Sequence, residues 1–154
     1  MYLYKKIINK LILNKLSLSV VESCTGGLLA YNITKYRNAS IIFNAGYITY
    51  SNESKIKDLK INKDTILKNG SVSAEVAKEM AENLFIKNKS KISISTTGIA
   101  GPGGSTKYKP VGLVYVGIHF NSKTRVFKKN FKGTRIQIQK QCVKFIFKHL
   151  DNLI

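Results

Sequence analysis

Segments with the spacing of amphipathic helices alternate along this chain with short apolar runs that end in turns. In the first fifteen residues, apolar side chains recur at helical spacing with lysines between them, which predicts an amphipathic helix. A short strand is expected at 17–21 and a helix at 28–33, with residues 22–27 as the turn between them. This strand–turn–helix order favours a fold in which helices and strands share one core.

The remainder of the chain continues the alternation. Strands are expected at 45–50, 92–95, 112–120 and 125–131, and helices at 52–59, 74–85 and 134–150. Ser51 or Asn52 can cap the first of these helices, Ser73 can cap the second, and a turn at 121–122 predicts a hairpin. Together they predict an α/β fold, a three-layer α/β/α domain with a mixed sheet. With 154 residues and neither repeat nor linker, residues 1–154 are expected to form a single domain.

The formal charge of +18 suggests a nucleic-acid partner, because clustered cations gain free energy when they release counterions from phosphate. The cations are not clustered, however. Only three of the 26 basic residues are arginines, and lysines run through nearly every segment. No aromatic-rich stacking motif accompanies them. We therefore expect a lysine-rich solvated surface, which concentrates anionic metabolites near a cleft, and no specific nucleic-acid partner.

Lysines at positions 5, 6, 10 and 15 interrupt the apolar residues of the N-terminal segment. No run there reaches the length of a signal-peptide core or a membrane span. Cys24 and Cys142 cannot build a disulfide framework, and no cysteine–histidine cluster has zinc-ligand spacing. These features predict a cytoplasmic protein with no membrane association and no bound metal.

Two turns are candidates for chemistry. In residues 22–27, the N–H groups of a helix start can face an anion or an oxyanion, and the glycines admit a ligand close to the backbone. The alternative is that Ser23 or Thr25 merely caps the helix. The glycine-rich stretch 97–106 can wrap a phosphate or a ribose through its N–H groups, or serve as a flexible connector. It matches neither the P-loop nor the dinucleotide fingerprint.

Tyr50 stands at a predicted strand end, and Lys55 follows roughly one helical turn later. A lysine can deprotonate a serine only if desolvation or a nearby cation lowers its pKa well below the usual value of about 10.4. Taken alone, Lys55 is one of 23 lysines and is most simply a solvated surface residue. His119 and His149 are expected to be structural, which leaves no histidine base for a Ser-His-Asp site.

Six stretches of the chain resemble, in order, the pattern of the CinA C-terminal domain family. They are residues 21–30, 43–55, 70–73, 97–104, 109–112 and 131–135. Together they span essentially the whole chain and are far more specific than any one alone. The resemblance implies a stand-alone nicotinamide-nucleotide amidase. This enzyme hydrolyses the carboxamide of nicotinamide mononucleotide to nicotinate mononucleotide and ammonia, without a metal or organic cofactor. The resemblance also suggests a homodimer or higher oligomer.

Carried over residue by residue, the resemblance implies that Ser23 is the nucleophile, Lys55 the general base and Tyr50 a relay or orienter between them. It also implies a set of substrate-binding residues, namely Glu22, Thr25, Gly26, Gly27, Thr97, Gly98, Gly101 and Arg135. An amide is a poor electrophile, so the serine needs a base and donors for the oxyanion, each worth about 3–4 kcal/mol. The helix start after Ser23 is expected to supply such donors. Cys24 is the rival nucleophile, because a thiol at a helix N-terminus can have a lowered pKa.

Two positions depart from the family pattern. Asn38 stands where the family usually has glycine, and Gln139 stands where a further basic residue often occurs, which predicts a weaker affinity for phosphate. Two other functions stay open: a catalytically idle domain kept for protein–protein interaction, and a lysine-driven nucleic-acid binder. The joint presence of Ser23, Tyr50 and Lys55 favours the enzyme.

Overall fold

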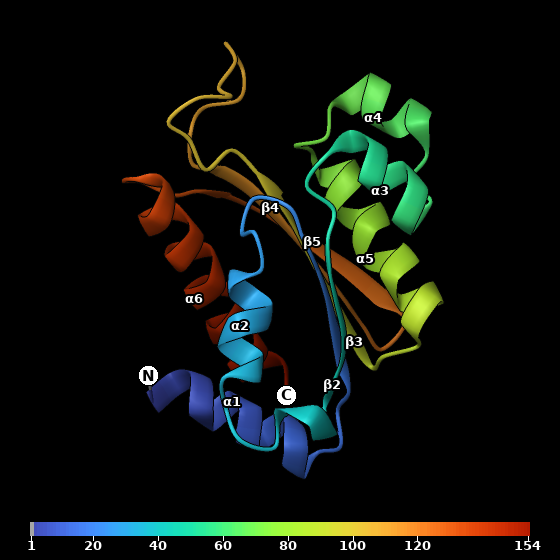
Figure 1. The fold of residues 1–154 in the computed structure, drawn as a ribbon, viewed down its shortest axis with the longest axis vertical. Helices are drawn as coiled ribbons and strands as arrows, with labels where there is room; N and C mark the ends of the chain where they lie inside the picture. The colour runs from blue at the N-terminus through green and yellow to red at the C-terminus, as the bar shows by residue number, and fades with distance from the viewer. Residues whose placement is uncertain (1) are drawn as a thin grey trace.

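The computed structural model describes residues 2–154, which form a five-stranded sheet with helices on both faces (Figure 1). The helices are α1 (Tyr2–Leu13), α2 (Leu28–Thr34), α3 (Asn52–Leu59), α4 (Lys63–Asn69), α5 (Ala74–Asn88) and α6 (Arg135–Leu153), with a 3₁₀ turn η1 (Ala39–Ile41). The strands are β1 (Leu18–Glu22), β2 (Phe43–Ile48), β3 (Ile92–Gly98), β4 (Leu113–Phe120) and β5 (Lys123–Asn130), in spatial order β2-β1-β3-β4-β5. Strands β2, β1 and β3 are parallel, and β4 and β5 are antiparallel to their neighbours. The predicted α/β fold with a mixed sheet is confirmed.

The two faces of the sheet carry different side chains. Along β3, Ile92 and Ile94 join the larger apolar core, formed with α1, α2 and α6, whereas Ser95 faces α5. The Ser95 hydroxyl donates to the carbonyl of Ala77 in α5 at 2.6 Å, and a Cβ on Gly117 would lie 2.5 Å from that carbonyl oxygen. These small residues let α5 pack close to the sheet. Helices α3 and α4 pack against α5 (Figure 1).

Most predicted boundaries agree with the structure to within a few residues. The side chain of Ser51 caps α3, and that of Ser73 caps α5. Strand β3 continues to Gly98, beyond the predicted end, because its last residues still pair with β4. Helix α4 was not predicted. It has seven residues, of which only Ile66 is buried, so it leaves no periodic apolar stripe in the sequence.

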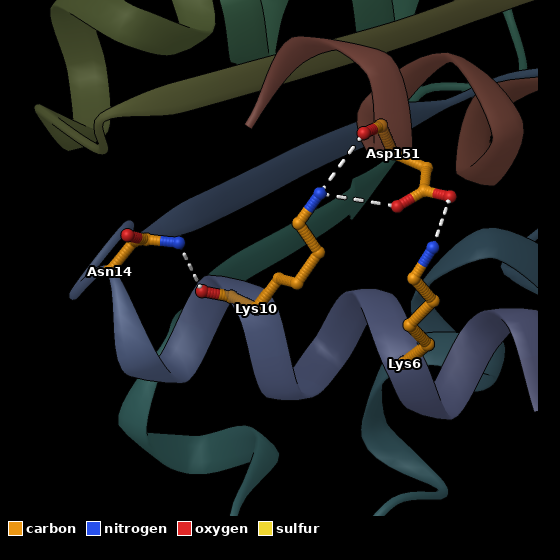
Figure 2. A network of polar contacts seen from close by, with 4 residues as sticks. All are labelled: Lys6, Lys10, Asn14 and Asp151. Atoms are coloured by element: carbon orange, nitrogen blue, oxygen red, sulfur yellow. Dashed lines mark hydrogen bonds and ion pairs between the residues drawn. The ribbon is translucent and has the colours of Figure 1, made fainter.

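Acidic residues are unevenly distributed over the fold. Six of the eight lie between residues 52 and 88, in α3, α4 and α5, together with seven lysines, so this layer carries one net positive charge. The rest of the chain holds nineteen cations and two carboxylates, and therefore seventeen of the eighteen net charges. Of those two carboxylates, Glu22 is buried and Asp151 accepts from Lys6 and Lys10, which ties α6 to α1 (Figure 2). None of the described helices is long and apolar enough to cross a membrane.

Candidate active site

Ser23 lies directly after β1, at the edge where the carboxyl ends of three parallel strands meet. Its backbone N–H donates to the Thr96 carbonyl of β3 at 3.0 Å, which extends the pairing of β1 with β3 by one residue. Lys55 belongs to α3, the helix that follows β2. Because β1 and β2 are parallel neighbours, the chain after each strand emerges at the same edge, and the two side chains meet there.

Lys55 is the functional side chain whose surroundings differ most from a surface position. Its side chain is only 1% exposed, and its Nζ donates to Ser23 Oγ at 3.1 Å and to the Thr49 carbonyl at 2.8 Å. Burial disfavours the ammonium form and lowers the pKa of Lys55 to about 8. About a tenth of this amine is therefore uncharged at pH 7, far more than for an ordinary lysine, and the uncharged amine can accept the Ser23 proton through the same contact.

Tyr50 occupies a different place from the one expected. Lys55 contacts Ser23 directly, so Tyr50 does not stand between them as a relay. The Tyr50 side chain is 59% exposed, and its hydroxyl accepts from Arg135 Nη2 at 2.5 Å. Arg135 also donates from Nη1 to the Gly101 carbonyl at 2.8 Å. The guanidinium thus links the start of α6 to the end of β2 and to the glycine loop, here defined as residues 99–104.

The helix start after Ser23 does not supply oxyanion donors, contrary to expectation. The buried carboxylate of Glu22 accepts from the N–H groups of Gly27, Leu29 and Ala30 at 2.8–3.1 Å. These are the groups that an oxyanion would need, and a carboxylate at a helix N-terminus is a strong competitor for them. Glu22 therefore caps α2 and holds the turn, and it does not face a substrate.

The other residues of the nucleophile turn, here defined as residues 23–27, are also held by the protein. The Thr25 hydroxyl, 2% exposed, pairs with that of Thr96 at 2.8 Å. Gly26 and Gly27 adopt positive φ, 58° and 99°, and form the bend rather than the wall of a cavity. Cys24 lines the cavity, but burial raises the pKa of its thiol to about 12, so the thiolate form is disfavoured.

A cavity of about 340 Å³, here called the site cavity, opens at this edge of the sheet. Its lining includes Ser23, Lys55, Tyr50, Arg135, Thr97, Gly98 and Gly101 of the predicted set, whereas Glu22, Thr25, Gly26 and Gly27 lie outside it. The lining also includes Ser71 and Val72, which were not predicted as site residues, and Ile99, Ala100, Gly103 and Gly104, which belong to the stretch 97–106 that was a candidate for binding a phosphate or a ribose. The motif at 70–73 was the available signal for the first two. The Thr97 hydroxyl donates to the Ser71 carbonyl at 2.7 Å and brings that segment to the cavity.

Residues of the glycine loop line this cavity, and several of their backbone N–H groups are unpaired in the described part of the chain. Within residues 2–154, the N–H groups of Ala100, Gly101 and Gly103 donate to no other protein group. The same holds for the N–H of Thr25 at the nucleophile turn. Loops with several unpaired N–H groups are typical anion sites. The arrangement can therefore hold an anionic ligand beside a serine that has its own base.

The two departures from the family pattern have structural explanations. Asn38 has φ 67°, in the left-handed region that favours glycine and that asparagine tolerates better than most residues. Gln139 donates from Nε2 to the Cys24 carbonyl at 2.9 Å, so it braces the nucleophile turn from α6. Gln139 does not line the site cavity.

Both histidines lie away from the site cavity. His119 pairs with Ser93 at the start of β3, and its Nδ1 lies 2.8 Å from the Thr124 hydroxyl. The ring of His149 in α6 packs against Phe127. Among residues 2–154, no group of three or more His, Cys, Asp and Glu side chains could hold a metal ion. The titratable side chain that contacts Ser23 in this structure is Lys55.

Fold and site together define a three-layer α/β/α protein with a buried serine–lysine pair at the carboxyl edge of its parallel strands. The model of the CinA C-terminal domain matches residues 2–154, so the chain belongs to this family. A provisionally named competence-damage inducible protein from Clostridium botulinum (strain Langeland) is 50% identical over 129 residues, 84% of this chain and 32% of that protein. A similarly named protein from Caldicellulosiruptor saccharolyticus is 45% identical over 138 residues, which make up 90% of this chain and 34% of that protein. The chain thus spans about a third of the length of these relatives.

Solved structures agree with this assignment. The crystal structure of a CinA superfamily protein from Escherichia coli superposes with a TM-score of 0.94 at 28% identity, covering 99% of this chain and 88% of that one. The crystal structure of the competence/damage inducible protein CihA from Agrobacterium tumefaciens gives a TM-score of 0.94 at 30% identity, and the match covers 99% of this chain and 93% of that one. The family resemblance seen in the sequence is confirmed.

Proposed function

We propose that this protein is an amidase that hydrolyses the carboxamide of nicotinamide mononucleotide to nicotinate mononucleotide and ammonia. The observation that carries the proposal is the contact between the buried Lys55 amine and Ser23 Oγ, at 3.1 Å on the wall of the site cavity. A serine paired with a lysine is an established alternative to the Ser-His-Asp arrangement. The proposal is supported by the N–H groups of the glycine loop that are unpaired among the described residues, since this loop lines the same cavity and could bind a nucleotide phosphate.

The reaction begins with proton transfer from the Ser23 hydroxyl to the uncharged Lys55 amine as Oγ attacks the carboxamide carbon. The C=O bond opens to an oxyanion, and the tetrahedral intermediate collapses with cleavage of the C–N bond. The nitrogen takes the proton from Lys55 and leaves as ammonia. Water, deprotonated by Lys55, then hydrolyses the Ser23 ester and releases the carboxylate, which restores the free serine and the amine.

Stabilisation of the oxyanion is assigned to the backbone N–H groups that line the cavity, because Glu22 occupies those of α2. Phosphate binding is assigned to Arg135, whose planar fork suits a phosphate, together with the glycine loop. Tyr50 holds the guanidinium and presents its ring at the mouth of the cavity. Tyr50 is therefore a positioning residue for Arg135 in this proposal.

The test is ammonia release from nicotinamide mononucleotide by the purified protein, with nicotinate mononucleotide identified as the second product. Ser23→Ala serves as the blank, because it removes the attacking oxygen and little else. Equal ammonia release by the folded Ser23→Ala variant would refute the serine mechanism. Failure of the unsubstituted protein to release ammonia, with the nucleotide bound, would instead favour the idle interaction domain.

A further inference from the structure

A second cavity, of about 300 Å³, lies between the β4–β5 hairpin and the last turns of α6. Three basic side chains, Lys123, Arg125 and His149, line this hairpin cavity together with apolar side chains that include Ile118 and Leu153. The hairpin cavity lies at the amino end of β3, where Phe120 pairs with Ile92. The nucleophile turn lies at the opposite end of that strand, so the two cavities are separate.

The register of the hairpin explains why cations and apolar groups meet here. Arg125 pairs with Ile118, and Lys123 pairs with Phe120. Directly paired residues of antiparallel strands share a face of the sheet, in this case the face covered by α6. Each cation therefore stands beside an apolar residue of β4, and all four residues line the cavity.

No carboxylate balances these cations. Among residues 2–154, neither Lys123 nor Arg125 forms an ion pair, and the nearby Asp151 is engaged by Lys6 and Lys10 (Figure 2). The carboxyl end of α6 contributes about half a negative charge, which two full cations outweigh. The cavity also belongs to the part of the chain that holds seventeen of the eighteen net charges. The local potential is therefore positive.

His149 is placed to sense a bound anion. Its ring packs against Phe127 of β5 with 4.2 Å between centroids and lies 6.0 Å from the ring of Phe145, which holds the imidazole in place. Burial, and then the charge of Arg125, lower the pKa of His149. An anion bound between these groups would favour the imidazolium form and would therefore raise the pKa of His149.

We propose that the hairpin cavity is a second ligand site, which binds a small phosphate monoester with an apolar body. The phosphate would lie between Arg125 and Lys123, since a guanidinium can bind phosphate oxygens in a bidentate way. The apolar body would contact Ile118, Phe120 and Leu153. The volume of the cavity falls at the small end of the usual range for ligand pockets, about 300–1,000 Å³.

The test is an NMR titration of the His149 imidazole with inorganic phosphate and, separately, with phenyl phosphate. Both probes should raise the pKa of His149. Phenyl phosphate should bind about fivefold more tightly, because part of its ring leaves water. If inorganic phosphate binds as well as phenyl phosphate, the cavity is an anion site without an apolar pocket, which contradicts the proposal. No response of His149 to either probe also overturns it.

Matched variants separate a built site from general attraction to a basic surface. Arg125→Ala should weaken phenyl phosphate binding by about tenfold. Lys128→Ala removes the same charge from the opposite face of β5 and should change binding by less than about twofold. Lys123→Ala provides a second probe if Arg125→Ala loses stability. Arg135→Ala, in the site cavity, should leave the His149 response unchanged. If Arg125→Ala and Lys128→Ala weaken phenyl phosphate binding equally, the ligand is attracted only by the general positive charge of the surface, and the proposal is wrong.

Discussion

Two glycine-containing turns follow adjacent parallel strands at the same edge of the sheet, and they are built in opposite ways. In the nucleophile turn after β1, the protein itself occupies most of the polar groups, and the N–H of Thr25 is an exception. Glu22 takes the N–H groups of α2, Thr25 pairs with Thr96, and Gln139 holds the Cys24 carbonyl. In the glycine loop after β3, the N–H groups of Ala100 and Gly101 remain unused within residues 2–154.

Because of this difference, one turn can hold the serine in place while the other keeps donors available for a ligand. A serine that attacks a carbonyl must be held within a fraction of an ångström, so its turn is best saturated with internal hydrogen bonds. A ligand-binding loop must keep donors available, so its backbone is best left unpaired. The presence of glycine in both turns therefore does not indicate the same role.

The largest effect is expected at the serine–lysine pair. Ser23→Ala should lower kcat by at least about a thousandfold, and Lys55→Met should do nearly the same, because residues that act as a unit lose most of their effect when either is removed. Nucleotide binding, measured by calorimetry, should persist in both. The matched control is Cys24→Ala, which should keep its activity. Loss of activity in a folded Cys24→Ala variant would transfer the nucleophile role to the thiol.

The second prediction concerns the glycine loop. Arg135→Ala should raise KM by about ten- to a hundredfold, because it removes charge-assisted hydrogen bonds to phosphate and frees the Gly101 carbonyl. The value of kcat should change much less. Lys132→Ala, which removes an exposed cation three residues earlier, is the control for general electrostatics. An unchanged KM for Arg135→Ala would mean that the guanidinium only braces the loop.

The third prediction tests whether Glu22 is structural. Glu22→Gln should lower the free energy of unfolding by about 2 kcal/mol, because a neutral amide replaces a buried carboxylate that accepts three N–H groups. Asp58→Asn makes the same chemical change at an exposed position and should cost less than about 0.5 kcal/mol. Denaturant unfolding measures both. If Glu22→Gln leaves the free energy of unfolding unchanged but raises KM, Glu22 is a substrate-binding residue after all.

The smallest effect follows from the pKa of Lys55. In the proposed mechanism the uncharged amine of Lys55 is the base, and because its pKa is about 8, activity should rise as pH increases through 8 and then level off. The fraction of uncharged amine, and with it kcat/KM, should increase about tenfold between pH 7 and pH 9. A profile that is flat over this range in a folded protein would exclude Lys55 as the base.

Sequence patterns predicted the elements that have strong local signals. The caps at Ser51 and Ser73 and the apolar stripe of α5 are properties of neighbouring residues, so they could be recognised without the fold. The family resemblance singled out Ser23 and Lys55, and the parallel pairing of β1 with β2 explains how residues so far apart meet. The burial of Lys55 could not be predicted, because its sequence context equals that of a surface lysine.

The roles of other residues could not be predicted, because these roles depend on three-dimensional contacts. Glu22 is adjacent to Ser23 in sequence and was predicted to bind the substrate, but its carboxylate accepts hydrogen bonds from the N–H groups of α2. Tyr50 lies near Lys55 in sequence, but its hydroxyl meets Arg135 across 85 residues of chain. Ser71 reaches the cavity through its carbonyl contact with Thr97. A side chain's direction is set by its tertiary partners, which adjacency in sequence does not reveal.

The uneven distribution of charge between the layer of α3 to α5 and the rest of the chain gives the molecule a permanent dipole moment. On a negatively charged support, such as a cation-exchange resin, the protein should adsorb in one orientation, with α1 and α6 toward the support and α3 to α5 toward the solvent. The salt concentration needed for elution would then report the cations of one side rather than the total of +18. Because the site cavity opens at the sheet edge between the layers, the adsorbed protein should remain accessible to its substrate.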